Sequence, residues 1–306
     1  MSEQPDDLRD ARLELRFALA EGDAVAPADH LRERVLAAAV AERAPGSTVL
    51  APDRISGAEA FARIVARLGA LLRELGPAEW SQPPKGYPDV QHLVGHLIGV
   101  EAAFHTVLAG AADPSTASDH QAMTAASVAE QDGRPPTATL HDWSARTTAT
   151  IAAVADRDPG DEVAFYAATF PLDELLVLRA FEMWIHDEDV RRATGRPLLA
   201  PDPETLARMV EVAITLLPFG LVQAGRVRAG RAVRLVLTGG SGGTWDVNLD
   251  DGPDRRRADA RAVVDAASFC RVIGNREDVT STGAIVDGAE DLVGDLFAAA
   301  ATLALD

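Results

Sequence analysis

The stretch Phe181–Pro197 reads Phe-Glu-Met-Trp-Ile-His-Asp-Glu-Asp-Val-Arg-Arg-Ala-Thr-Gly-Arg-Pro. On an α-helix, residues four apart lie on the same face, so Glu182 and His186 present a carboxylate and an imidazole to one point, with Asp189 about a turn further on. The run that leads into it from Leu172 is apolar nearly all round, which is typical of a helix buried inside a bundle. A buried carboxylate is costly unless it is paired, and a divalent cation suits both side chains. The stretch therefore predicts that Glu182 and His186 form a pair of metal ligands inside a helical bundle.

Working outward, three more long segments show helical apolar spacing. Ser56 and Asp89 are suitable N-caps for two of them. Gly195 and Pro197 are expected to end the helix that carries Glu182 and His186. Gly95 and Gly99 indicate that the second helix packs closely against a neighbour. A weaker helix is expected at residues 120–130. The sequence predicts a four-helix bundle made of residues 56–75, 89–105, 137–156 and 172–195.

The pattern changes after residue 200. A helix at 203–224 precedes two alternating strand-like runs, 232–237 and 244–249, which are split by a glycine-rich turn. A strand at 259–264, a helix at 266–273, a strand at 283–286 and a final helix at 290–303 follow. The fold class is thus multi-domain α+β. We expect an N-terminal helical extension at 1–50, a bundle domain at 54–198 and a C-terminal α+β domain at 201–306.

Composition excludes several classes of partner. The formal net charge is −18, whereas a protein that neutralises nucleic-acid phosphates needs a basic stripe. No membrane contact is expected, because no apolar run was found that approaches the roughly 20 residues that span a bilayer. The first residues lack the features of a signal peptide, and Cys270 is the sole cysteine, so the expected location is the cytoplasm. The extension at 1–50 is a candidate surface for a protein partner.

A metal site needs a third ligand. His92 and His96 share a face of the second bundle helix, and His96 is preferred because it lies deep in the apolar run while His92 is nearer the helix start. His96, Glu182 and His186 would give two imidazoles, one carboxylate and an open position, as in a catalytic zinc site. On spacing alone, a Glu/His pair four residues apart is more often a hydrogen-bonded pair or a surface match than a set of metal ligands.

Trp80, the run Asp-Val-Gln-His-Leu-Val-Gly-His-Leu-Ile-Gly-Val-Glu from Asp89, and above all Phe181–Pro197 resemble the mycothiol-dependent maleylpyruvate isomerase family of actinobacteria. The resemblance covers roughly residues 54–306. It implies a DinB/YfiT-like metal-binding bundle followed by a small, sterol-carrier-like α+β domain.

By position, the resemblance places the metal ligands on His96, Glu182 and His186, with zinc or another divalent metal as cofactor. His92 falls where relatives usually have an acidic residue, so it is expected to support the ligands rather than bind the metal. Asp189 and Arg192 match positions that orient the ligands or the neighbouring helix. The chain departs from the family at Gly86-Tyr87-Pro88-Asp89, just before the second helix, and in its N-terminal segment.

A zinc ion with an open position can convert a thiol into a thiolate at neutral pH. Cys270 lies in an apolar run and is interpreted as a buried structural residue, so the thiol is expected from outside. The resemblance supplies mycothiol as cosubstrate and a small electrophile as substrate. Addition, rotation and release would give cis-trans isomerisation, whereas retention of the sulfur would give S-transfer. Arg276 resembles a Gly-Arg position of the family and is the predicted catalytic residue. Arg192 and Arg276 are the predicted cofactor-binding residues, with Arg196 as an alternative.

Two other functions stay open at this point. The chain could be a non-catalytic metal-binding or regulatory module whose metal position is closed, or whose pocket is filled by the N-terminal helices. Metal-assisted hydrolysis would need a general base, for which Asp189 and Glu101 are candidates, although no His-Glu-x-x-His pattern is present.

Overall fold

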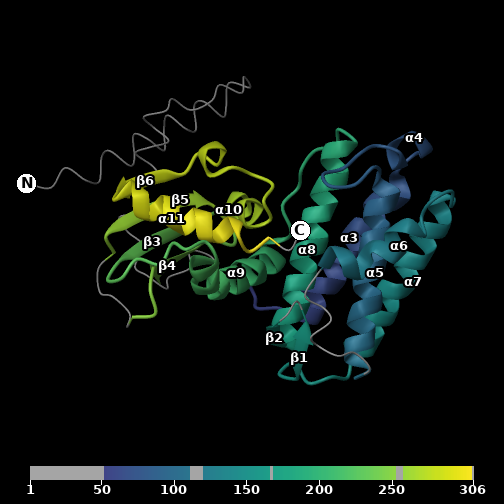
Figure 1. Cartoon of the computed structure of the whole chain (residues 1–306), viewed down its shortest axis with the longest axis horizontal. Helices are drawn as coiled ribbons and strands as arrows, with labels where there is room; N and C mark the ends of the chain where they lie inside the picture. The colour runs from purple at the N-terminus through teal and green to yellow at the C-terminus, as the bar shows by residue number, and fades with distance from the viewer. Residues whose placement is uncertain (1–51, 111–119, 166–167, 253–257, 305–306) are drawn as a thin grey trace, which may run out of the picture.

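The computed structural model describes residues 52–110, 120–165, 168–252 and 258–304 (Figure 1). A group of long helices lies on one side of the molecule and a small sheet with its own helices on the other. The helices α8 (Leu172–Ala193) and α9 (Pro203–Gln223) lie between them. This is the multi-domain α+β architecture that the sequence predicts.

The helical part contains the four predicted bundle helices. Ser56 accepts a hydrogen bond from the Glu59 backbone and Asp89 accepts one from the His92 backbone, so both predicted N-caps are confirmed. The bundle helices are α3 (Gly57–Glu74), α5 (Val90–Leu108), α7 (Pro136–Val154) and α8. A one-turn helix and a short hairpin were not predicted; they are α4 (Pro77–Trp80), β1 (Glu162–Phe165) and β2 (Ala168–Pro171).

The weaker helix of the connection is α6 (His120–Ala129), and it packs against α5. The two small residues of α5 make this close approach possible. A Cβ atom added to Gly95 would lie 2.5 Å from Cγ of Gln131, and one added to Gly99 would lie 3.0 Å from Cα of Thr124. The glycines thus fix how near α6 comes to α5, and this separation brings Thr124 to the site described below.

The C-terminal part is a four-stranded sheet in the order β4-β3-β5-β6. The central pair β3–β5 is parallel, and both outer pairs are antiparallel. The strands are β3 (Ala232–Thr238), β4 (Gly243–Asn248), β5 (Ala260–Asp265) and β6 (Ile285–Gly288). The helices are α10 (Ala266–Ile273) and α11 (Glu290–Ala301), and a 3₁₀ turn occupies Val279–Ser281. Every predicted strand and helix of this domain is present.

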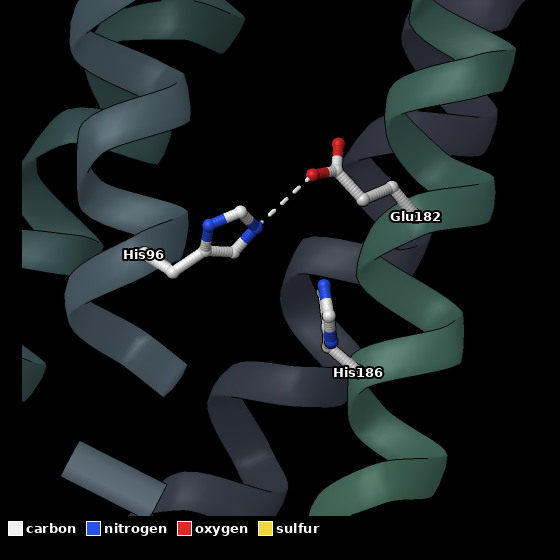
Figure 2. A group of neighbouring side chains, drawn as sticks. All are labelled: His96, Glu182 and His186. Atoms are coloured by element: carbon white, nitrogen blue, oxygen red, sulfur yellow. Dashed lines mark ion pairs between the residues drawn. The ribbon is translucent and has the colours of Figure 1, made fainter. Parts of the chain in front are cut away.

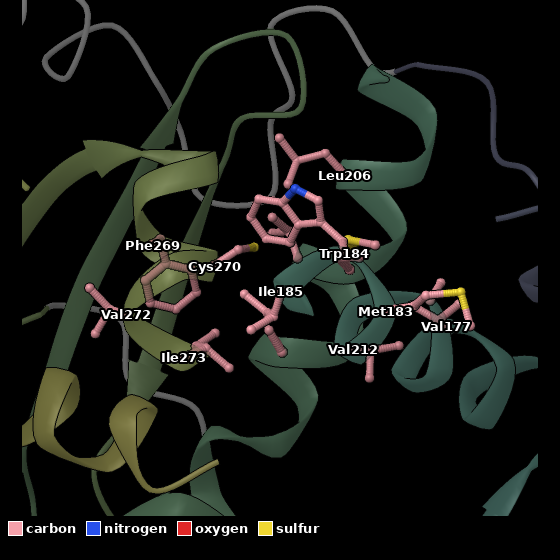
Figure 3. Packing of buried hydrophobic residues seen from close by; sticks show 14 of the residues in the cluster. Val177, Met183, Trp184, Ile185, Leu206, Val212, Phe269, Cys270, Val272 and Ile273 are labelled. Atoms are coloured by element: carbon pink, nitrogen blue, oxygen red, sulfur yellow. The ribbon is translucent and has the colours of Figure 1, made fainter. Parts of the chain in front are cut away.

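The larger hydrophobic core runs through both parts of the molecule. Figure 3 shows Trp184 and Ile185 of α8 facing Phe269, Cys270 and Ile273 of α10, with side chains of α9 beside them. A Cβ atom on Gly274, which follows α10, would lie 2.3 Å from Cδ1 of Ile185, so only glycine permits this approach without a shift. The two domains therefore share buried apolar surface instead of being joined by a linker alone.

Helix α9 differs from the sequence expectation in one respect. By length and composition alone it is apolar enough to cross a membrane. Within its most apolar window, however, 56% is buried inside the protein, where it packs against α10, α11 and α8. Its buried apolar residues belong to the shared core, whereas Phe219 and Val222 are exposed.

Candidate metal centre

Helices α5 and α8 bring the three predicted ligands together. His96 extends from α5, and Glu182 and His186 extend from successive turns of α8 (Figure 2). One donor atom from each lies within 4.8 Å of the others. The three residues are 2%, 7% and 3% exposed, respectively. His96 Nε2 lies 3.4 Å from Glu182 Oε1.

The two imidazoles are oriented from behind. His96 Nδ1 hydrogen-bonds with Thr124 Oγ1 at 3.0 Å, and His186 Nδ1 hydrogen-bonds with Asp189 Oδ2 at 3.1 Å. Nε2 is therefore the atom that each ring turns toward the carboxylate of Glu182. A histidine that binds a metal through Nε2 typically donates its other N–H in this way. Two imidazole nitrogens and one carboxylate oxygen fit a catalytic zinc site, in which the fourth position belongs to a water or substrate.

Asp189 is held in turn by an arginine of the other domain. Arg276 Nε donates to Oδ1 at 2.7 Å and Nη2 donates to Oδ2 at 2.8 Å. Burial alone would raise the pKa of Asp189, but the hydrogen bonds from His186 and Arg276 outweigh it and lower the pKa to about 2. Asp189 is therefore ionised at neutral pH and can accept the Nδ1–H of His186. Arg276 of the C-terminal domain thus helps to orient His186, a candidate ligand of the bundle, through Asp189.

Glu182 has its own buried partner. Arg179, one turn earlier on α8, is fully buried and donates from Nη1 to Glu182 Oε2. Its Nη2 donates to Glu101 Oε1 at 2.5 Å, and Glu101 Oε2 accepts from Thr150 Oγ1 at 2.5 Å. One oxygen of Glu182 is thereby held by the arginine, while Oε1 faces His96. The arginine balances two carboxylates in a region that excludes water.

Sequence reasoning did not assign these supporting residues. The spacing of Arg179 and Glu182 by three residues is a signal for their pairing on a helix. No sequence pattern points to Thr124 or Thr150, because their contacts cross between helices. Tyr87 lies in the stretch that departs from the resembled family, and its ring centroid is 5.4 Å from that of His96 and 6.4 Å from that of His186. The departure thus lies directly at the candidate centre.

The remaining predicted residues, His92, Arg192 and Arg196, each pair with acidic side chains. His92 contacts Asp89 at 2.7 Å through Nδ1 and Asp132 at 3.1 Å through Nε2. Partial burial lowers its pKa, but the two carboxylates outweigh burial and raise it. Arg192 donates to Glu188 at 3.0 Å, and Arg196 contacts Glu79 and Glu74. The roles predicted for His92, Arg192 and Arg196 stay predictions.

A cavity of about 420 Å³ opens beside the centre, and we call it the polar cavity because Lys85, His92, Asp132 and Arg276 are part of its wall. His96 and Thr124 form part of its wall, together with Tyr87, His92 and Arg276. Lys85 also lines it and donates to the Asn275 carbonyl at 2.6 Å, so the loop before α5 touches the loop after α10. The cavity therefore lies between the two domains and reaches His96, one of the candidate ligands.

Cys270 is fully buried, as predicted. Burial raises the pKa of its thiol, with a further contribution from Asp265. A thiolate at this position is strongly disfavoured, so Cys270 is a core residue and not a nucleophile.

Residues 61–191 match the family model of the mycothiol maleylpyruvate isomerase N-terminal domain. The bundle is thus similar to the N-terminal domain of this isomerase family. The matched segment includes His96, Glu182 and His186. It ends before α9, so the C-terminal sheet domain lies outside the match.

Solved structures extend the likeness to both domains. A crystal structure of the mycothiol-dependent maleylpyruvate isomerase superimposes with a TM-score of 0.53 at 16% identity, covering 76% of this chain and 91% of that one. A crystal structure of a histidine-to-alanine mutant of that isomerase gives the same values. At this identity the likeness shows a shared fold, a helical N-terminal region followed by a small sheet domain. No curated protein sequence matches the chain.

Proposed function

We propose that this protein is a metal-dependent enzyme that uses mycothiol to isomerise, or to transfer sulfur to, a small electrophile. The observation that carries the proposal is the convergence of His96, Glu182 and His186 inside the bundle, next to the polar cavity that His96 lines, with both imidazoles oriented through Nδ1. The family of the bundle and the fold of the solved isomerase support mycothiol as the thiol. Zinc is the metal that best fits two imidazoles and one carboxylate, and another divalent metal is the alternative.

A divalent cation held by these three residues would lower the pKa of an incoming thiol. The protein's own groups prepare the site for it. Asp189 hydrogen-bonds with Nδ1 of His186, which leaves Nε2 facing the other candidate ligands, and Arg179 donates to Oε2 of Glu182. The polar cavity offers hydrogen-bonding groups for a hydrophilic, sugar-bearing thiol, among them His92, Asp132 and Lys85.

The reaction requires no oxidant. The thiolate sulfur forms a bond to the β-carbon of an α,β-unsaturated carbonyl compound, and the electron pair of the double bond moves to the carbonyl oxygen. Rotation about the resulting single bond and expulsion of the thiolate give the isomer. If a proton reaches the α-carbon instead, the sulfur stays attached and the outcome is S-transfer. Arg276 lines the polar cavity and also donates to Asp189. Its predicted catalytic and cofactor-binding roles therefore need a test that separates them from its contact with Asp189.

Metal-assisted hydrolysis is less compatible with the geometry. Both oxygens of Glu101 accept hydrogen bonds from Arg179 and Thr150 within the bundle. Asp189 is paired with His186 and Arg276, which stabilise its charge and make it a weak base. Neither carboxylate that the sequence offered as a general base is thus placed to activate water. The non-catalytic module would need its pocket closed or filled by residues 1–50, which lie outside the described residues.

The proposal is tested by metal analysis followed by thiol titration. Protein purified without chelator is expected to contain about one zinc per chain, and mycothiol is expected to bind only the metal-loaded form. His186→Ala should lose both properties. His141→Ala is the matched control, because the His141 side chain is 82% exposed and its ion-pair partner is Asp142. Absence of metal, or thiol binding that survives metal removal, would contradict the proposal.

A further inference from the structure

A second cavity reaches the candidate ligands from another direction. It lies among α8, α9, the end of α10 and the residues that follow α11. Glu182 and His186 form part of its wall, whereas His96 lines the polar cavity. Donor atoms of the three residues lie within 4.8 Å of one another, and each cavity is bordered by at least one of the candidate ligands.

The chemistry of this second cavity is apolar. Among the described residues that line it, Glu182 and His186 are the ones with polar side chains. The rest of the wall is hydrocarbon or backbone, and its larger side chains include Leu178, Phe181, Ile185, Leu216, Ile273 and Leu303. Its volume is about 50 Å³. One water-sized group needs roughly 10–15 Å³ on this measure, so the cavity suits a short alkyl chain or a small ring.

A carboxylate would be poorly accommodated there. Lys85, His92 and Arg276 line the polar cavity, but no arginine or lysine is among the described residues around the apolar one. An anionic group in this position would lose its hydration without gaining a cationic partner, and it would lie close to the carboxylate of Glu182. An apolar group gains from the same loss of water.

We infer that the apolar cavity holds a short alkyl or aryl substituent of the electrophile, so that the preferred substrate is an α,β-unsaturated carbonyl compound with an apolar end in place of a second carboxylate. The inference rests on the proposed function. The thiol approaches the metal ligands through the polar cavity and the electrophile through the apolar one, and sulfur and β-carbon meet between them. The wall of the apolar cavity then determines which electrophiles react.

The test compares two unreactive ketones of equal length, hexan-2-one and 5-oxohexanoate, on the full-length, metal-loaded protein. Binding is measured by ligand-observed NMR titration, and kcat/KM is measured with mycothiol and the corresponding α,β-unsaturated pair. The apolar compound is expected to bind, and to react, at least about tenfold better, since burying a carboxylate without a cationic partner is costly whereas burying a methyl group is favourable.

Two variants of α9 locate the effect. Leu216→Arg places a cation at the apolar cavity and should reverse the preference toward the carboxylate. Phe219→Arg is the matched control on the same helix, because Phe219 is 57% exposed and does not line the cavity, and it should leave the preference unchanged.

The outcomes separate the two claims. Equal or tighter binding of 5-oxohexanoate by the unmodified protein would overturn the inference, even where thiol binding depends on metal as proposed. Identical effects of Leu216→Arg and Phe219→Arg would also overturn it. If thiol binding fails while the ketone preference and its reversal hold, the apolar specificity of the cavity stands and the proposed thiol chemistry falls.

Discussion

The bundle and the C-terminal domain contribute to the candidate centre in different ways. The bundle provides all three candidate ligands, from α5 and α8. The C-terminal domain provides none of them, but its Arg276 holds the aspartate that orients His186. The chemistry of the site thus resides in one domain, while its geometry depends on both.

Three consecutive acidic residues of α8 show how this dependence arises. Asp187, Glu188 and Asp189 are at most 2% exposed. Asp187 binds Arg67 of α3, Glu188 binds Arg271 of α10, and Asp189 binds Arg276. Because successive helical residues point about 100° apart, the three carboxylates reach three different neighbours. Helix α8 is held by the bundle on one side and by the C-terminal domain on the other.

The largest effect should follow from loss of a ligand. His96→Ala removes an imidazole from the centre, and we expect metal affinity to fall by more than the roughly 10–100-fold that loss of a supporting partner costs. Chelator competition measures the affinity. His92→Ala, four residues earlier on the same helix, is the control, since His92 bonds with Asp89 and Asp132. Equal losses in the two variants would break the distinction between ligand and neighbour.

A fully buried ion pair within the bundle should matter more for stability than a partly exposed one in the sheet. Glu101→Gln leaves the guanidinium of Arg179 buried with one fewer carboxylate, and we expect a loss of about 3–5 kcal/mol in the free energy of unfolding. Asp246→Asn breaks the partly exposed pair with Arg234 in the sheet and should cost about 1 kcal/mol or less. Urea denaturation measures both, and similar losses would argue against the buried network.

The contribution of the C-terminal domain can be measured separately. Arg276→Gln removes the two hydrogen bonds to Asp189, and we expect metal affinity to fall roughly 10–100-fold. Arg192→Gln is the matched control, because Arg192 lies on α8 but binds Glu188 instead of Asp189. If only kcat with mycothiol changes in Arg276→Gln and metal affinity does not, the arginine acts on the thiol or substrate and not through Asp189.

The smallest effect concerns pH. Asp189 has a pKa of about 2 in the folded protein against a usual value of 3.8, so its stabilising contribution is present above about pH 4 and is lost as pH falls toward 2. The contribution is about 2 kcal/mol, since one pKa unit corresponds to about 1.4 kcal/mol. Urea denaturation of the metal-free protein and of Asp189→Asn should show a difference that shrinks with acidification. A difference that is constant with pH would contradict this explanation.

Sequence periodicity predicted the bundle and the sheet because each long element has a clear apolar face. The prediction that α8 begins near Leu172 is confirmed, and the glycine-rich turn correctly placed the β3–β4 hairpin. The β1–β2 hairpin was missed, since its two strands have four residues each, which is too short for a clear alternation of buried and exposed side chains. The single turn of α4 is likewise too short to show a period.

The candidate ligands could be found because two of them lie four residues apart on one helix, and because the surrounding motif resembles a known family. The contacts that orient them could not. Thr124 meets His96 from α6, and Arg276 meets Asp189 across 87 positions of sequence. Such pairs depend on how far each helix is rotated and how the domains dock, and neither quantity is written in local spacing.

The ion pairs between the acidic residues of α8 and arginines of other elements have a consequence for protein engineering. A fragment that ends near residue 198 would keep Asp187 with Arg67 but would separate Glu188 and Asp189 from Arg271 and Arg276. It would also expose the apolar surface around Ile185 that α10 covers. We expect such a fragment to be poorly soluble and weak in metal binding. A chimera that joins this bundle to the sheet domain of a distant homologue would have to retain Arg271 and Arg276. The unit that can be exchanged between homologues is therefore not the bundle domain alone, because α8 has to be kept together with the arginines that bind its acidic residues.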